Sequence, residues 1–550
     1  MKRLAGLLLA LLLLFSLTAL AEQSAEPVVE AVEEAAQVVN ETVETAIDEA
    51  ETASGGFLDG VAKVNGVVNG IVWGAPALVL LAFVGILMTA LTRVFQLTHF
   101  RHWMSKTIGA VFHDKHVTGH TADKSISQFQ SLCTALAATV GTGNIVGVAG
   151  AIMVGGPGAV FWMWVIAFFG MMTNYSENVL GIFYRRKNTH GEWSGGAMYY
   201  LRDGLGSFKG CKGIGTALAW LFSLFCLLAS FGIGNMTQVN SISGNMHTAF
   251  GVPAWVTGVF VMIMVGLVVV GGLKRIAAVT EKIVPFMVIL YMLGSIVIFV
   301  TNISQIGAVF SAIFRGAFAA KAATGGVVGY GIKLAIEQGM KRGVFSNEAG
   351  LGSSVMVHSN SNVKEPVKQG MWGIFEVFAD TIVVCTMTAF SVLSSGLVDL
   401  NTGATVAEYN GVALTKANLV STVFQIRFGW IGSAFIAVSI MLFAFSTVLG
   451  WSHYGTKAAE YLLGEKHTIP YRIVFVLLVF GGAVMGDNLA WDLADTFNGL
   501  MMIPNLIGVI ALSGIVAKIT RNYINRTFHG SGEAPMYSAF PDVQREQERS

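Results

Sequence analysis

Beyond residue 70, hydrophobic residues gather in long blocks that short polar and charged stretches separate. A helix of about 20 apolar residues crosses the hydrocarbon core of a bilayer. The pattern therefore predicts an all-α polytopic membrane protein with about eleven transmembrane helices. The predicted spans are residues 71–95, 128–152, 159–184, 214–246, 254–273, 283–303, 323–343, 370–396, 430–453, 470–486 and 497–518.

Composition agrees with a membrane protein. Of the 550 residues 54% are hydrophobic and only 12% are charged, whereas soluble proteins carry about 25% charged residues. The net charge of +1 lacks the basic excess of a nucleic-acid binder, so no nucleic-acid partner is expected. The four cysteines include no CxxC pair, which argues against a disulfide scaffold or a zinc site.

The first residues have the pattern of a targeting segment. Basic residues at 2–3, an apolar run over 4–20 and the A-x-A form of residues 19–21 predict a secretory signal peptide over 1–21. A retained membrane helix is the alternative. Residues 22–70 are expected to form an extracytoplasmic leader, in which 22–52 carry ten acidic residues and no Lys or Arg. Such a charged stretch is more typical of a partly disordered leader than of a docking arm.

The distribution of Lys and Arg predicts the orientation. With the start of span one outside, the cytoplasmic loops hold 26 Lys or Arg against six on the other side, which satisfies the positive-inside rule. The C-terminal tail, 521–550, is then cytoplasmic, and the transmembrane domain, 71–520, lies in a bacterial inner membrane. The predicted cytoplasmic loops are residues 93–127, 185–212, 274–282, 341–368, 457–472 and 518–550.

Span two contains three glycines, Gly141, Gly143 and Gly147, in the middle of the membrane. Glycine costs about 1 kcal/mol in a helix interior, and an interrupted backbone is tolerated in a membrane only where it is buried or lines a cavity. A break there would free amide N–H groups for a substrate carboxylate and carbonyls for a cation. Close helix packing through small residues at Gly143 and Gly147 is the alternative.

The order of the spans predicts an inverted repeat. Spans two to six (about 128–303) and seven to eleven (about 323–518) form two sets of five, and because five is odd the second set starts from the opposite side. Span seven should then be broken like span two. Glycine and charged residues do interrupt its sequence between Gly339 and Gly352.

The sequence contains five distinctive motifs, which are GTGNIVGVA at 141–149, GGPGAVFWMW at 155–164, FGIGNM at 231–236, KRGVFSNEAGLG at 341–352 and STVLGW at 446–451. In this order, and over about residues 70 to 520, the chain resembles the alanine or glycine:cation symporter family. The resemblance implies a LeuT-type fold with a 5+5 inverted repeat, no enzymatic activity, and sodium-coupled symport of alanine or glycine by alternating access, with sodium in place of any cofactor. A LeuT-type carrier for another amino acid, or one coupled to protons, is the alternative.

The resemblance also implies which residues bind substrate and ion. The carbonyls of Ala137 and Val140 and the hydroxyls of Ser446 and Thr447 would hold sodium, as hard oxygen ligands hold hard cations. Hydroxyls that bond carbonyls of their own helix are the alternative for the last two. The implied amino-acid site comprises Thr142, Gly143, Asn144, Gln238, Thr447, Trp451 and Phe231.

Three acidic residues, Glu177, Glu376 and Asp380, fall inside predicted spans. Intramembrane acids are candidates for proton coupling, but two of them lie near cytoplasmic span ends, and structural pairing is expected for all three.

The sequence offers little support for other classes of function. The sequence has no selectivity motif of a channel, no GxxxxGK[ST] of an ATP-driven pump, and a histidine cluster over 99–120 without acidic partners that favours solvated surface.

Overall fold

The computed structural model describes residues 60–119, 125–318, 328–485 and 488–549. The predicted signal peptide and most of the predicted leader lie outside these residues. The chain divides into two units, Met1–Val67 and Val68–Ser550. The second unit contains all the elements discussed below.

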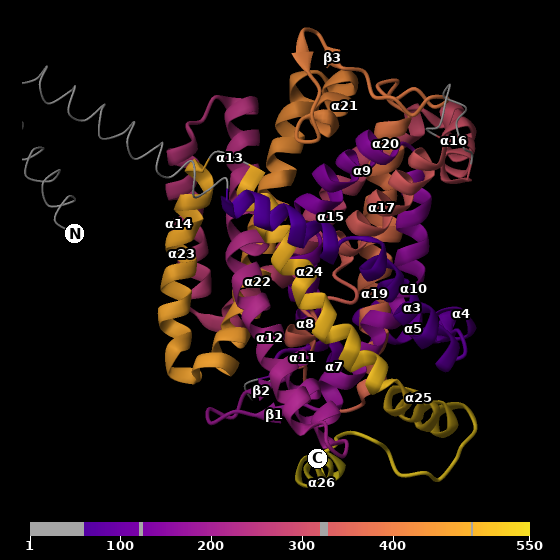
Figure 1. The fold of residues 1–550 in the computed structure, drawn as a ribbon, viewed down its shortest axis with the longest axis vertical. Coiled ribbons are helices and arrows are strands. Elements are labelled where there is room, and N and C mark those ends of the chain that lie inside the picture. The colour runs from indigo at the N-terminus through magenta and orange to yellow at the C-terminus, as the bar shows by residue number, and fades with distance from the viewer. Residues whose placement is uncertain (1–59, 120–124, 319–327, 486–487, 550) are drawn as a thin grey trace, which may run out of the picture. The chain divides into compact units, whose positions relative to one another are not determined.

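Every predicted span coincides with a helix or a pair of helices (Figure 1). In chain order the helices are α3 (Ala75–Leu91), α8 (Gln128–Thr139) with α9 (Val148–Gly155), α10 (Gly158–Phe183), α12 (Lys212–Phe231) with α13 (Thr237–Phe250), α14 (Ala254–Val269), α15 (Gly272–Thr301), α17 (Val328–Asn347), α19 (Pro366–Val377) with α20 (Thr386–Leu393), α22 (Trp430–Leu463), α23 (Thr468–Val484) and α24 (Asn488–Ala511).

The prediction of an all-α polytopic membrane protein is confirmed, but the count of eleven is not. Within the described residues, eight helical spans are long and apolar enough to cross a membrane, and nine if the bent pair α8–α9 counts as one. Helix α14 is apolar but shorter than the others.

The two predicted sets of five pack against each other through counterpart helices. Helix α9 of span two packs on α17 of span seven, and α10 of span three packs on α19 of span eight. Helix α8 lies between α15 and α22, and α12 contacts both α22 and α24. Helices α14 and α23 run side by side at one flank (Figure 1). Several of these contacts thus join helices that hold the same position in the two predicted sets.

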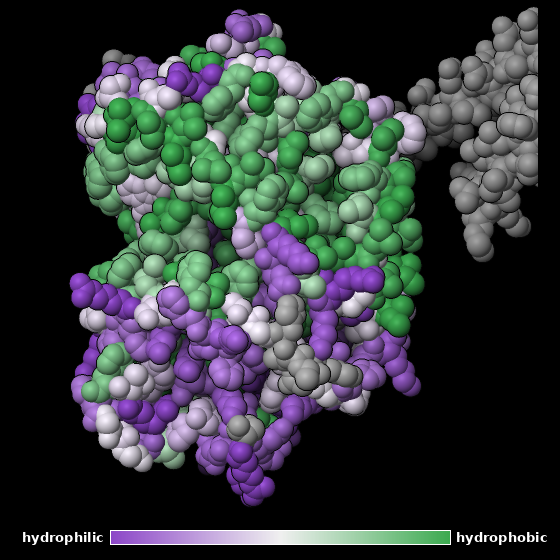
Figure 2. All heavy atoms as spheres, turned by 180° about the vertical axis from the view of Figure 1, so that it is seen from behind, coloured by the Kyte–Doolittle hydropathy of each residue, from purple (hydrophilic) through white to green (hydrophobic). Residues whose placement is uncertain are grey.

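Residues from five of the six loops predicted to be cytoplasmic meet at one end of this unit, whereas residues 274–282 belong to helix α15. Figure 2 shows hydrophilic residues gathered over that end and a hydrophobic band above it. Direct contacts join the loops: Ile126 N–H donates to Asn360 O at 3.1 Å, Thr189 N–H to Glu465 Oε1 at 3.1 Å, and Lys187 Nζ lies 2.6 Å from Glu546 Oε1. The hairpin β1 (Arg186–Lys187) and β2 (Trp193–Ser194) belongs to this end, and β3 (Glu408–Tyr409), β4 (Val412–Ala413) and α21 (Leu419–Phe428) to the opposite one (Figure 1).

A buried arginine fixes the loop that follows span seven. The guanidinium of Arg185, 1% exposed, donates to the carbonyls of Ser359 at 3.0 Å, Ser361 at 2.6 Å and Val363. Hydrogen bonds from a charged donor contribute about 1.5–3 kcal/mol each. The loop between α18 (Val355–His358) and α19 is therefore held firmly against the end of α10.

Several helices extend past the predicted spans. Helix α15 begins at Gly272 rather than 283, and α22 continues to Leu463 rather than 453. The C-terminal region predicted as part of span eleven and a tail forms α25 (Ser513–Phe528) and α26 (Pro541–Arg549). Hydropathy marks only the apolar part of a helix, so a polar extension beyond the bilayer escapes it.

We expect Gly450→Ala to destabilise the protein by about 1–3 kcal/mol, the usual cost of an added methyl in a packed interior. A Cβ at this position of α22 would lie 2.7 Å from Ala138 Cβ and 2.9 Å from Ala138 N, so α8 and α22 would have to separate. Thermal unfolding of the purified protein measures the effect. The control is Gly244→Ala on α13, where a Cβ meets nothing within 4 Å. Equal unfolding temperatures for both variants would contradict the close contact.

Candidate binding site at the broken helix

Span two is broken where its glycines predict. Helix α8 ends at Thr139, and the axis turns by 51° before the chain continues through η1 (Gly143–Gly147), a π-helical turn, into α9. Val140 has left the helical conformation, with ψ at 83°. We refer to residues 140–143 as the break.

Backbone groups in the break no longer pair as they do in a helix. Gly141 N–H donates to Thr139 O at 3.0 Å and to Asn144 Oδ1 at 2.9 Å, and Asn144 N–H donates to Gly141 O at 3.3 Å. In an unbroken helix these two amides would bond the carbonyls of Ala137 and Val140. Both carbonyls are thus released from helical pairing, at the two positions implied for sodium.

Gln238 of α13 and Thr447 of α22 both contact the break. The Gln238 Oε1 accepts from Thr142 Oγ1 at 3.0 Å, and its Nε2 donates to Ile233 O at 3.0 Å. A Cβ on Gly141 would overlap Thr447 Oγ1 and lie 3.5 Å from Gln238 Oε1. Three elements therefore meet at Gly141, and only glycine leaves room for them.

The hydroxyls of Ser446 and Thr447 donate to their own helix. Both bond Phe443 O, at 2.8 Å and 3.0 Å, as the alternative interpretation of these residues expects. Donation uses the hydrogen and leaves the oxygen lone pairs available as acceptors. The same bond fixes the position of each oxygen.

A second group of polar side chains surrounds Asp380 and is fully buried. The carboxylate accepts from Asn144 Nδ2 at 2.6 Å, Ser346 Oγ at 2.8 Å and Thr381 Oγ1 at 2.7 Å. These residues come from η1, from the end of α17 and from η6 (Phe378–Cys385). All three donors are neutral, and no Lys, Arg or His of the described residues lies within 4.0 Å of this carboxylate.

Sequence reasoning missed Ser346 and expected a structural pairing partner for Asp380. Ser346 sits directly before the interruption in span seven, and that position was the available signal. Helix α17 ends at Asn347, and Glu348, Gly350 and Gly352 all have positive φ before α18 begins. Span seven is thus interrupted just past its predicted end at 343.

Trp451 is 1% exposed, which excludes the interfacial anchor that was its alternative. Its side chain presses on Gly234 in η4 (Gly232–Met236), and its ring lies 5.3 Å from that of Tyr454. Phe231 does not join this group, because its ring packs on Tyr471 and Phe475 of α23 at 5.4 Å and 6.5 Å.

The other two intramembrane acids pair with imidazole and amide side chains. Glu376 Oε2 lies 2.9 Å from His358 Nε2 and accepts from Asn174 at 3.4 Å. Glu177 accepts from Asn505. Both carboxylates are at most 1% exposed. Both acids therefore have structural partners within the helix packing.

The sequence pattern of the sodium:alanine symporter family matches residues 58–538. The chain belongs to this family. It is 43% identical over 467 residues to the sodium/alanine symporter AgcS of Methanococcus maripaludis, covering 85% of this chain and 98% of that one. It is 35% identical over 476 residues to the probable sodium/glutamine symporter GlnT of Bacillus subtilis, covering 86% and 92%. Among solved structures, MhsT in complex with L-phenylalanine matches with a TM-score of 0.47 and 13% identity, over 73% of this chain and 99% of that one.

Family membership makes the chain a multi-pass membrane transporter rather than an enzyme. Its activity is cation-coupled symport of an amino acid. The break releases the carbonyls of Ala137 and Val140 from helical pairing and pairs the amides of Gly141 and Asn144 with other groups.

We expect Gly141→Ala to reduce amino-acid uptake at least tenfold, because the added methyl overlaps the Thr447 hydroxyl and must displace the break or α22. Gly147→Ala is the matched control six residues on, since its Cβ would meet only Arg342 Cδ at 4.0 Å. Uptake of labelled substrate into proteoliposomes, normalised to folded protein, compares the two. If Gly147→Ala reduces uptake more than Gly141→Ala does, close helix packing and not the break is the reason for glycine at these positions.

Proposed function

We propose that this chain carries alanine or glycine into the cell together with sodium, by alternating access in a LeuT-type 5+5 architecture. The observation that carries the proposal is the break, which releases two carbonyls beside Thr447 and places Gln238 against Thr142. Family membership supports sodium as the ion. The clustering of Lys and Arg on one side supports an outside N-terminus and a cytoplasmic C-terminus.

The proposed sodium site consists of the carbonyls of Ala137 and Val140 and the hydroxyls of Ser446 and Thr447. Neutral hard oxygens suit a monovalent hard cation, as they suit other hard cations. The approach of Gly141 to Thr447 supports this grouping, because it brings the two helices together at the level of the released carbonyls. Bound sodium would hold α8 to α22.

The proposed amino-acid site lies across the break, at Thr142, Gly143 and Asn144, with Gln238 opposite. Backbone N–H groups at such a break suit a substrate carboxylate. Buried Trp451 limits the space beside η4, which favours a small side chain. Because one relative is named as a probable glutamine symporter, the size of the amino acid that this chain accepts should be measured.

Proton coupling is the second candidate, and the Asp380 group favours it. A buried carboxylate with neutral donors alone is costly when charged. Either a bound cation or a proton would offset that cost. The two mechanisms differ in the gradient that drives uptake.

We expect uptake of labelled alanine into proteoliposomes to require an inward sodium gradient, because the proposed site consists of neutral oxygen ligands for that ion. The measurement imposes sodium, potassium and pH gradients separately, with unlabelled glycine, alanine and glutamine as competitors. Uptake that persists in potassium and follows the pH gradient would overturn sodium coupling. Competition by glutamine equal to that by alanine would overturn the proposed size limit.

We expect Thr447→Val to weaken sodium affinity by at least tenfold, since valine keeps the β-branched shape but lacks the hydroxyl oxygen. Substrate affinity should fall mainly at low sodium, because the linkage between two bound ligands is reciprocal. Asn144→Ala should impair substrate binding even at saturating sodium, because Gly141 N–H loses its side-chain acceptor.

Substrate binding titrated across sodium concentrations separates these two variants. Rescue of Asn144→Ala by high sodium, or failure of high sodium to rescue Thr447→Val, would reverse the assigned roles. Ser439→Ala on α22 is the control, because this hydroxyl also bonds its own helix, to Phe435 O at 2.8 Å, and lies outside the proposed site.

A further inference from the structure

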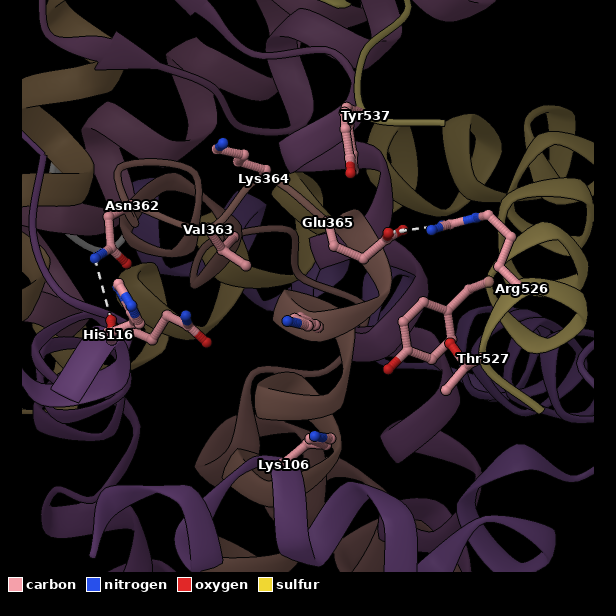
Figure 3. A pocket seen from close by; sticks show the side chains of 12 residues that line it. Lys106, His116, Asn362, Val363, Lys364, Glu365, Arg526, Thr527 and Tyr537 are labelled. Carbon is pink, nitrogen blue, oxygen red and sulfur yellow. Dashed lines mark hydrogen bonds and ion pairs between the residues drawn. The ribbon is translucent and has the colours of Figure 1, made fainter. Parts of the chain in front are cut away.

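A pocket of about 530 Å³ lies at the end of the unit that is predicted to face the cytoplasm. Its walls come from α5 (Phe100–Lys106), from the loop between α18 and α19, and from α25 with the segment that follows it. Figure 3 shows Lys106 and Lys364 on different sides of it, with the Glu365–Arg526 pair at a third. The volume lies within the range of small-molecule sites, about 300–1,000 Å³.

The pocket has an excess of positive charge. Arg526 Nη2 lies 2.7 Å from Glu365 Oε2, which neutralises that pair. Lys106, Lys364 and Lys368 also line the pocket, and no carboxylate of the described residues lies within 4.0 Å of their ammonium groups. Three like charges on one concave surface attract an anion, and more strongly an anion with more than one charge.

Two buried acceptor atoms belong to residues of the same pocket. Glu365 is 7% exposed, and its Oε1 accepts no hydrogen bond from the described part of the chain. The same is true of Asn362 Oδ1, although Asn362 Nδ2 donates to His116 O at 3.2 Å. Buried acceptors of this kind are normally paired. A ligand with hydroxyl groups would supply the missing donors.

We propose that this pocket binds a phosphate ester that also carries hydroxyl groups. The lysines bind the phosphate oxygens, and Glu365 and Asn362 accept hydrogen bonds from the hydroxyls. Glycerol phosphate is the simplest molecule with this chemistry, and it occurs both free and as the headgroup of phosphatidylglycerol. The proposal does not depend on which amino acid or ion the protein transports.

Exposed apolar side chains beside the pocket indicate that a bilayer surface lies close to it. Leu97 of α4 (Phe95–Thr98), Phe100 of α5 and Phe112 after α6 (Ile108–Val111) are 58%, 43% and 75% exposed, and Phe528 at the end of α25 is 45% exposed. The rings of Phe528 and His102 lie 4.8 Å apart, so α5 and α25 share one face. Apolar residues beside basic ones are typical of an interface with anionic lipid.

An occupant of this pocket would bridge separate elements of the transporter. Lys364 of the loop between α18 and α19 and Lys368 of α19 belong to one wall, and Lys106 of α5 belongs to another. A ligand held by the lysines of both walls would connect the segment that follows span seven to α5.

The test uses the full chain in nanodiscs of phosphatidylcholine, titrated with glycerol 1-phosphate by calorimetry. A second arm counts phosphatidylglycerol molecules that native mass spectrometry finds retained after extraction from phosphatidylglycerol-containing vesicles. Saturable binding in the first arm identifies a soluble ligand, and retention in the second identifies a lipid headgroup. Either result supports the proposal if the variants below behave as expected.

The pocket variant is Lys364→Gln/Lys368→Gln, and Lys106→Gln on α5 is an independent second variant. We expect the double variant to weaken binding at least tenfold, or to lose the retained lipid, and Lys106→Gln to weaken it severalfold. The control Lys209→Gln/Lys212→Gln removes the same charge from exposed lysines of the same end and should bind like the unaltered chain. Absence of saturable binding in both arms, or equal binding by pocket and control variants, would overturn the proposal.

Discussion

The interruption of span two depends on one constraint, which is that backbone N–H and C=O groups in a membrane interior need partners that water cannot supply. At residues 140–143 the helix no longer provides these partners. The side chains of Asn144 and Gln238 replace them, at 2.9 Å from Gly141 N and 3.5 Å from Thr142 N. Because these side chains are in turn held by Asp380 and by Ile233 O, the break in span two is connected to spans four and eight.

The interruption of span seven is stabilised in the same way. Asn347 Oδ1 accepts from Ala349 N–H at 3.0 Å, and Asn505 of α24 donates to Gly350 O at 2.8 Å. The two interruptions meet where Ser346 and Asn144 bond the same carboxylate. Asp380 thus links the two predicted sets of five spans, because each set donates a hydrogen bond to the same carboxylate.

The sequence allowed the helical spans and the break at Gly141 to be predicted, because each follows from local composition. Hydropathy placed every span on a helix but could not show that α15 and α22 continue beyond the bilayer. The Asp380 group could not be predicted, because its members are up to 236 residues apart and meet only through tertiary packing. Phe231 belongs to a motif that resembles the family, but the motif did not indicate that its ring contacts Tyr471 of α23.

The π-helical segments η1, η4 and η6 have a consequence for comparing members of the family. A π turn holds one residue more than an α turn, and each residue rotates a helix face by about 100°. The extra residue within Gly232–Met236 therefore sets the direction in which Gln238 leaves α13. Deleting one residue from that segment would turn the amide away from Thr142 without altering any side chain of the site. Single-residue gaps in alignments at these three segments consequently indicate a rearranged binding site, even where every motif residue is retained.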